Sequence, residues 1–282
     1  MPSTCGCEEA CGCEKVCGLS GWGNLPESPT KTSSFRTESE LKNLLEYQKT
    51  IARGLGRSYA DQATNRDNFS VRFTSFDRFI SFDDNRGILE CEAGVSLEKI
   101  IRYMAPRGWF PMICPGTKYI TVGGAIANDV HGKAHHIDGS FINCVEAITL
   151  MMPDGKVVHA DRENNDELFM ANFGGLGLLG FILSARLRLR RIDSTYFEQL
   201  AVSVRNIEEM LEMLDARDKD FSYSVAWVDS LATGKKLGKG VISFGNHARI
   251  DELPFSKMLE PIKVSGKSKL NVPFFLPSFA LN

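Results

Sequence analysis

A glycine-rich stretch at residues 115–139, PGTKYITVGGAIANDVHGKAHHIDG, constrains this chain more than any other feature. Gly123 and Gly124 lack a Cβ, so the backbone there can approach a ligand closely. The small residues around them indicate a short helix over residues 121–128, whose free N–H groups and positive dipole end would suit a diphosphate. A glycine-rich turn followed by a solvated polar loop is the alternative, because short glycine motifs often occur by chance.

Two further glycine-rich segments favour a ligand site. Residues 52–61 read ARGLGRSYAD, and residues 174–180 read GGLGLLG before a strand-like FILSARLRLRR. The first segment is not the G-x-G-x-x-G of a nicotinamide-binding fold, and no acidic residue follows at the expected spacing. Both segments can still offer backbone N–H groups to phosphate. Three such turns are less expected by chance than one, so they predict a phosphate-bearing ligand.

The composition narrows the range of partners. The chain has 33 basic and 35 acidic residues, which argues against a nucleic-acid-binding protein. No apolar run reaches the roughly 18 residues that a membrane span requires. The first residues lack the basic region and apolar core of a secretory signal. The expected compartment is therefore the cytoplasm, with attachment to a membrane surface as an alternative.

Five of the eight cysteines lie within residues 1–18: Cys5, Cys7, Cys11, Cys13 and Cys17. A thiolate metal site or a redox tail is one interpretation of this cluster. The spacing is not the C-x-x-C of common zinc sites, however, and no His is nearby. We therefore expect a disordered extension at residues 1–18 and no metal site. Cys91, Cys114 and Cys144 lie in apolar surroundings typical of small core residues.

The remaining patterns predict mixed helix and sheet. Residues 19–34 are rich in Gly, Pro and Ser and are expected to form a surface segment. Thr37 with Glu40 forms a capping-box pattern, and Ser96 and Asn206 precede further helical patterns. Strands are expected at residues 69–73, 78–82, 88–93, 145–150, 157–159, 181–190, 197–204, 221–229 and 241–247. The Cys-rich extension covers residues 1–18. A boundary near residues 192–195 then divides the rest of the chain into residues 19–192 and 193–282.

The motifs RGLGRSYAD, PGTKYITVGGAIANDVHGKAHH and GGLGLLG together resemble the FAD-binding domain of the vanillyl-alcohol-oxidase type. Within that superfamily, DVHGKAHHIDGSF is similar to the polyprenylphosphoryl-ribose oxidase branch, and the resemblance runs from near Leu19 to the last residue. It implies an α+β fold, with a two-subdomain FAD-binding domain of the PCMH type followed by part of a substrate, or cap, domain. The cofactor-binding residues that it implies are Ala52, Arg53, Gly54, Leu55, Gly56, Arg57, Ser58, Tyr59, Gly116, Thr117, Thr121, Val122, Gly123, Gly124, Asn128, His131, Gly175, Gly177, Gly180 and Ile182.

The resemblance also implies a reaction. A flavin accepts hydride at N5 from a carbinol C–H, and the hydroxyl must lose its proton to a base or a water path. The candidate catalytic residues are His131, Lys133 and Tyr59. By resemblance, His131 lies against the flavin and Lys133 points toward the substrate and the flavin face; a structural hydrogen bond or a solvated loop is the alternative for each. The first glycine loop contains no His, so the FAD is expected to be noncovalent.

The expected substrate is a polyprenylphosphoryl-ribose, oxidised at its 2′-hydroxyl to a ketone during synthesis of a cell-wall arabinose donor. A short-chain reductase partner would complete the epimerisation. The alternatives are a soluble alditol or aldonolactone, or an inactive flavin-binding fragment. The final residues, NVPFFLPSFALN, resemble an interior segment, so this chain is expected to be incomplete and unable to turn over alone.

Overall fold

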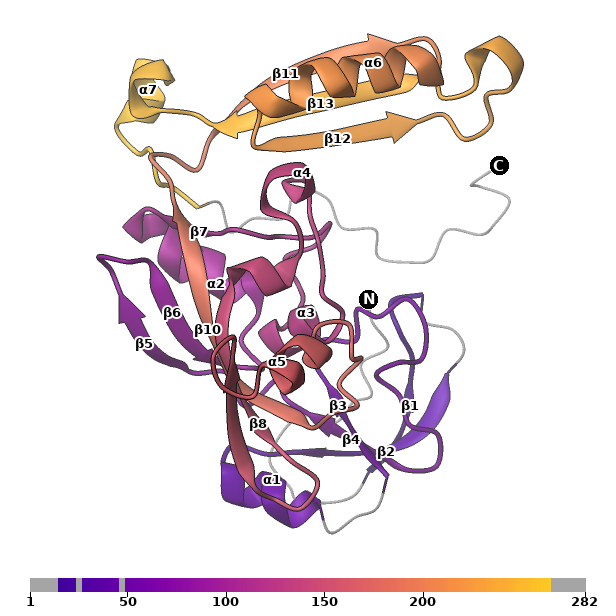
Figure 1. The fold of residues 1–282 in the computed structure, drawn as a ribbon, viewed down its shortest axis with the longest axis vertical. Helices are drawn as coiled ribbons and strands as arrows, with labels where there is room; N and C mark the ends of the chain where they lie inside the picture. Colours follow the sequence, from indigo (N-terminus) through magenta and orange to yellow (C-terminus); the bar gives the residue numbers. More distant parts are fainter. Residues whose placement is uncertain (1–14, 24–26, 46–48, 265–282) are drawn as a thin grey trace.

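The computed structural model describes residues 15–23, 27–45 and 49–264. Cys5, Cys7, Cys11 and Cys13 lie outside the described residues, as does the apolar segment at residues 271–282. Three sheets and several short helices follow one another along the chain (Figure 1). This mixture of helix and sheet confirms the α+β class. The limits predicted for the domains stay a prediction, apart from the correction at the N-terminus below.

The first sheet has the strand order β1-β2-β4-β3, formed by β1 (Lys15–Leu19), β2 (Ser28–Ser34), β4 (Phe69–Arg72) and β3 (Thr50–Arg53). β2 and β3 run parallel to β4, and α1 (Glu38–Leu44) connects β2 to β3. The Thr37 hydroxyl accepts the Glu40 N–H at 3.2 Å and so caps α1. This helix begins where the capping pattern predicts.

Two predictions about the N-terminal region were wrong. Residues 15–18, assigned to a disordered extension, belong to β1, which pairs antiparallel with β2. Residues 28–34, assigned to a surface segment, form β2, in which Thr30 and Thr32 are buried. The sequence SPTKTSS alternates inward and outward, but its inward residues are hydroxylic rather than apolar, so hydrophobic periodicity does not reveal the strand.

The second sheet has the strand order β5-β6-β10-β8-β9, and all its pairs are antiparallel. Its eleven-residue strand β10 also pairs with the short strand β7, which the sequence analysis did not predict. The strands are β5 (Phe79–Asp83), β6 (Ile88–Glu92), β7 (Trp109–Pro111), β8 (Val145–Met151), β9 (Val157–Asp161) and β10 (Phe181–Arg191). Alternating Phe, Leu and Ala residues bury one face of β10.

Four helices accompany the second sheet: α2 (Leu97–Met104), α3 (Val122–Ala127), α4 (His135–Asp138) and α5 (Asp166–Asn172). The Ser96 hydroxyl caps α2 by accepting the Lys99 N–H at 3.1 Å. Gly108, at φ 80°, ends the turn that follows α2, a backbone conformation that favours glycine. These signals were readable in the sequence; the single turn of α4 was not.

One hydrophobic core joins the first two sheets. The Phe73 ring, just after β4, stacks on the Phe181 ring at the start of β10, with centroids 5.9 Å apart. Leu89, Phe141 and Ile148 lie in the same cluster, each at most 1% exposed. The two sheets are therefore held against each other by continuous apolar packing, and a cleft between their loops has fixed walls.

The third sheet has the strand order β11-β13-β12, formed by β11 (Phe197–Val204), β13 (Gly240–His247) and β12 (Tyr223–Val228). Helix α6 (Ile207–Arg217) covers one face, where Met210 packs with Ile242 and Phe244. The short helix α7 (Phe255–Met258) follows β13. Figure 1 shows this sheet beyond α4, with β12 as its nearest strand, at the end of the molecule opposite α1.

None of the helices in the described part of the chain has both the length and the apolar content to cross a membrane.

The joint core predicts where stability is concentrated. Ile148 is 1% exposed on β8, whereas Val157 on the neighbouring strand β9 is 51% exposed. Ile148→Ala should lower the free energy of unfolding by about 2–5 kcal/mol, because it removes buried methyl groups and leaves a cavity. Val157→Ala, the control, should change it by no more than about 0.5 kcal/mol. Urea unfolding monitored by circular dichroism measures both, and equal losses would contradict the burial pattern.

Candidate functional site

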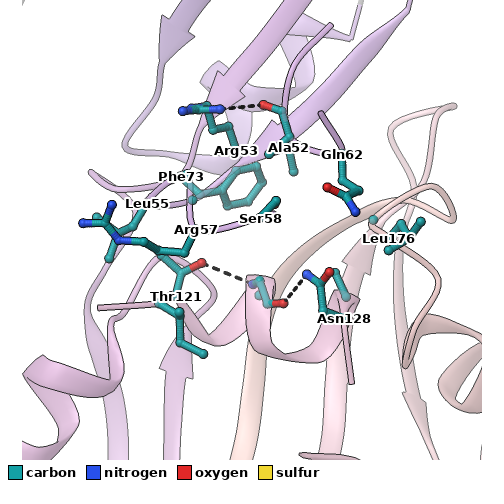
Figure 2. Close-up of a pocket in the computed structure, with 18 of the residues that line it drawn as sticks. Ala52, Arg53, Leu55, Arg57, Ser58, Gln62, Phe73, Thr121, Asn128 and Leu176 are labelled. Atoms are coloured by element: carbon teal, nitrogen blue, oxygen red, sulfur yellow. Dashed lines mark hydrogen bonds between the residues drawn. The ribbon is translucent and has the colours of Figure 1, made fainter. Parts of the chain in front are cut away.

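A pocket opens between the loops of the first and second sheets (Figure 2). The end of β3 and the loop that follows it, residues 52–59, form one wall, and α3 forms the other. Residues 176–182 contribute a third side. All three glycine-rich segments of the sequence therefore meet at one cavity, although more than one hundred residues separate the first from the last.

The structure places fifteen of the twenty predicted cofactor-binding residues in the pocket lining. These are Ala52, Arg53, Gly54, Leu55, Gly56, Arg57, Ser58, Tyr59, Thr121, Gly123, Gly124, Asn128, Gly177, Gly180 and Ile182. The other five, Gly116, Thr117, Val122, His131 and Gly175, do not line it. Val122 is fully buried, and a Cβ on Gly175 would lie 2.4 Å from the Ala171 carbonyl oxygen, so these two residues serve packing. Contact with a cofactor stays a prediction for the whole set.

The first glycine loop presents free backbone donors. Among the described residues, no acceptor receives a hydrogen bond from the backbone N–H groups of residues 54–59. One backbone bond to this loop runs the other way, from the Trp22 N–H to the Ser58 carbonyl at 2.7 Å. Consecutive free N–H groups at a cavity wall are what an anion such as a diphosphate requires.

A half-buried positive charge lies beneath this loop. The Arg53 guanidinium donates to the Ser20 carbonyl at 2.8 Å and to the Ala63 carbonyl at 3.0 Å. Partial burial, followed by repulsion from Arg72 and Arg57, lowers the pKa of Arg53 below its ordinary value. Gly56, at φ 64°, leaves room for the guanidinium, since a Cβ there would lie 2.4 Å from it. We use the term cradle for residues 54–59. The cradle offers free N–H donors beside the Arg53 cation, so the residues present fit the diphosphate of FAD.

The start of α3 was predicted to supply free N–H groups, and this prediction was wrong. The N–H groups of Val122 and Gly123 donate to the carbonyls of Val95 and Ala93, both at 2.8 Å. The Gly124 N–H donates to the Thr121 hydroxyl at 3.2 Å. The helix packs so closely on the turn after β6 that its first donors are already used.

The close packing of α3 explains two of the glycines. A Cβ on Gly54 would lie 2.3 Å from the Thr121 Oγ1, and a Cβ on Gly123 would lie 3.0 Å from the Ala93 Cβ. Gly54 therefore lets the first loop touch the cap of α3, and Gly123 lets α3 touch the second sheet. Both glycines are required by contacts within the protein, before any ligand is considered.

The third glycine-rich segment wraps around the end of α3. The Leu176 N–H donates to the Ala127 carbonyl at 2.8 Å, and Leu176 adopts φ 55°. Gly174, Gly177 and Gly180 also have positive φ, so the segment changes direction several times within seven residues. These turns bring Leu176 and Gly177 to the pocket wall.

The predicted catalytic residues are divided between two places. Tyr59 lines the pocket and is 87% exposed, and its ring meets the Trp22 ring edge-on, with centroids 6.1 Å apart. His131 and Lys133 lie outside the pocket lining, on the loop that leaves the pocket after Val130. Both are exposed, and the His131 ring contacts His135 at 5.1 Å. The structure therefore does not bring these three side chains together.

The loop after Val130 extends toward the third sheet. The Lys133 carbonyl accepts the N–H of Ser224 in β12 at 2.9 Å. The His136 Nε2 lies 2.9 Å from the Phe221 carbonyl, just before β12. Of the three predicted catalytic residues, Lys133 is thus the one whose backbone contacts the third sheet.

Eight residues line the pocket that the sequence analysis did not select: Gln62, Ala63, Phe73, Ala93, Ile120, Ala127, Val130 and Leu176. Most are small or apolar and come from elements that only the folded chain brings together. Gln62 carries a sequence signal, since it is a polar residue one position after the first glycine-rich segment.

Comparisons with known proteins agree with this geometry. Residues 34–161 match the model of the family described as FAD binding domain. The chain is 36% identical over 234 residues to decaprenylphosphoryl-beta-D-ribose oxidase of Mycolicibacterium smegmatis, which is 82% of this chain and 51% of that protein. It is 28% identical over 207 residues to L-gulonolactone oxidase of Mus musculus, which is 72% of this chain and 45% of that protein.

A cytokinin dehydrogenase of Arabidopsis thaliana is 27% identical over 158 residues, or 54% of this chain and 31% of that protein. The chain thus spans about half the length, or less, of these curated relatives.

The contact between Gly54 and Thr121 can be tested by adding one methyl group. Gly54→Ala should weaken FAD binding at least tenfold, or about 1.4 kcal/mol, because the new Cβ pushes the first loop away from α3. Gly23→Ala is the control, since a Cβ there meets nothing within 4 Å. Titration of the apoprotein with FAD, followed by flavin fluorescence, measures both affinities; equal affinities in the two variants would contradict the assigned role.

Proposed function

This chain belongs to the FAD-binding oxidoreductases, and from that premise we propose that it oxidises a sugar hydroxyl to a ketone. One observation carries the proposal. Val130 lines the same pocket as the free N–H groups of residues 54–59, and the loop bearing His131 and Lys133 begins at the next residue. When bound, FAD supplies the hydride acceptor for such a reaction. The protein's contribution is to hold the cofactor and to place the hydroxyl.

Roles for the individual residues follow from their positions. The N–H groups of residues 54–59, above the Arg53 guanidinium, hold the diphosphate. The Lys133 ammonium, which forms no ion pair with any described residue, is available to orient a sugar oxygen or to balance developing negative charge. His131 is available to accept the hydroxyl proton, directly or through water. Tyr59 lines the pocket from an exposed position.

The proposed substrate is a polyprenylphosphoryl-ribose, oxidised at the 2′-hydroxyl as one step toward a cell-wall arabinose donor. This choice is supported by 36% identity to a relative named for decaprenylphosphoryl-ribose oxidation. A lipid-linked substrate would bring the protein to a membrane surface, and a short-chain reductase would act on the ketone. A soluble sugar lactone is the second candidate, favoured by the similarity to L-gulonolactone oxidase.

Anaerobic mixing of the FAD-loaded protein with each candidate tests the substrate. A short-chain prenylphosphoryl-ribose should bleach the flavin absorbance, whereas L-gulonolactone and free ribose should not. Bleaching by the lactone alone would replace the first candidate by the second, and bleaching by none of these compounds would contradict both.

The FAD should be held without a covalent bond. The first glycine loop, ARGLGRSYAD, contains no His that could attach to the flavin ring. Acid precipitation of the purified yellow protein should therefore release the colour into the supernatant, where its absorbance is measured. Colour retained in the washed pellet would contradict this prediction.

Lys133→Ala should leave FAD bound and slow flavin reduction by about 10²-fold or more, because it removes a positive charge from the reacting centre. The measurement is the single-turnover rate of flavin bleaching. Lys156→Ala removes another exposed lysine, in the turn between β8 and β9 and outside the pocket lining, and serves as the control. A wild-type rate in Lys133→Ala would assign this lysine to a solvated loop.

A further inference from the structure

Arg190, near the end of β10, joins two elements that lie far apart in the sequence. Its guanidinium forms an ion pair with Asp138, the last residue of α4, and the two side chains are only 22% and 7% exposed. The same guanidinium lies over the ring of Tyr223, the first residue of β12, 5.7 Å from the ring centroid. A single side chain therefore touches both the loop that bears Lys133 and the third sheet.

Two further contacts connect the same parts. The Ser224 N–H donates to the Lys133 carbonyl, and the His136 ring lies against the Phe221 carbonyl, both at 2.9 Å. Residues 133–138 are therefore attached to residues 221–224 at three points. We use the term clamp for these three contacts: Arg190 with Asp138 and Tyr223, Ser224 with Lys133, and His136 with Phe221.

The near end of the loop is fixed separately. The Asp129 carboxylate accepts the Ile142 N–H at 3.0 Å, and a Cβ on Gly132 would lie 2.1 Å from the Cys114 carbonyl oxygen. Beyond Gly132, the exposed Lys133 side chain has no ion pair of its own within the described part of the chain. The position of the Lys133 side chain therefore depends on the backbone of residue 133, and the clamp holds this backbone.

We propose that Arg190 is a positioning residue, which through Asp138 and Tyr223 holds the loop that bears Lys133 against the third sheet. The planar guanidinium suits this task, because it can pair with a carboxylate through its edge while its face lies on an aromatic ring. Removing it would leave the largely buried Asp138 carboxylate unpaired, which is costlier than losing a surface ion pair.

The effect of Arg190 on the reaction rests on the proposed function, but its effect on the loop does not. Hydrogen exchange of the FAD-loaded protein measures the loop directly. Arg190→Gln should speed exchange at least tenfold for the Ser224 N–H, which donates to Lys133, and for the Asp138 N–H, which donates within α4. Amides in the centre of β8 should exchange as in the wild type.

Arg186→Gln is the matched control. Arg186 lies on the same face of β10 and pairs with the Glu146 carboxylate at 3.3 Å, but it touches neither α4 nor β12 in the described contacts. This variant should leave exchange at Ser224 and Asp138 unchanged. Equal acceleration in both variants, or none in Arg190→Gln, would overturn the proposal.

Conservative and partner variants keep the test decisive. Arg190→Lys keeps the positive charge but lacks the planar guanidinium. The exchange rates of the Ser224 and Asp138 amides should therefore lie between those of the wild type and of Arg190→Gln. Asp138→Asn removes the same ion pair from the other side and should loosen the same two amides. It decides the question if Arg190→Gln does not fold, and wild-type exchange in Asp138→Asn would then overturn the proposal.

The reaction provides a second measurement. Arg190→Gln should lower the limiting rate of flavin reduction at saturating substrate while leaving FAD affinity unchanged, since the cradle at residues 54–59 is separate from the clamp. A wild-type limiting rate alongside faster loop exchange would keep the clamp and reject its role in positioning. If no sugar reduces the wild-type flavin, the proposed function fails and the exchange result still decides the clamp.

Discussion

The pocket depends on a contact that only a glycine permits: Gly54 lies against the Thr121 hydroxyl. This contact presses the loop after β3, from the first sheet, onto the cap of α3, which belongs to the second sheet. The common core, with Phe73 stacked on Phe181, keeps the two sheets at that spacing. With the loop so placed, residues 54–59 line the cavity, and their N–H groups bond to no neighbouring strand in the described part of the chain. Because the core is rigid, the cradle is held in place before any ligand binds.

The glycines of the site fall into two groups with different physical tasks. Gly54 and Gly123 remove side-chain volume where backbone elements meet. Gly56, Gly177 and Gly180 adopt positive φ, and so reverse the chain where other residues would be strained. None of them needs to touch a ligand for its identity to matter. Glycine-rich motifs of this kind describe the construction of a site as much as its contacts.

Features set by neighbouring residues could be predicted from the sequence, whereas features that depend on residues distant in the chain could not. The side-chain caps at Thr37, Ser96 and Asn206, and the alternation of β10, could be read directly because cause and effect lie within a few residues. The glycine motifs identified most of the pocket. The use of the α3 donors by Ala93 and Val95 could not be foreseen, because it requires the packing of α3 on β6. Strand β2 was missed because its buried residues are hydroxylic.

The distribution of tryptophans over the three sheets affects the fluorescence of the protein. The chain contains three tryptophans, and each belongs to a different sheet region: Trp22 between β1 and β2, Trp109 in β7 and Trp227 in β12. Trp22 and Trp227 are 60% and 71% exposed, whereas Trp109 is 7% exposed. Their emission wavelengths should therefore differ, with the buried indole to the blue of the two solvated ones. Variants retaining one indole each would report on one sheet at a time, with Trp22 beside the pocket mouth as the natural energy donor to a bound flavin.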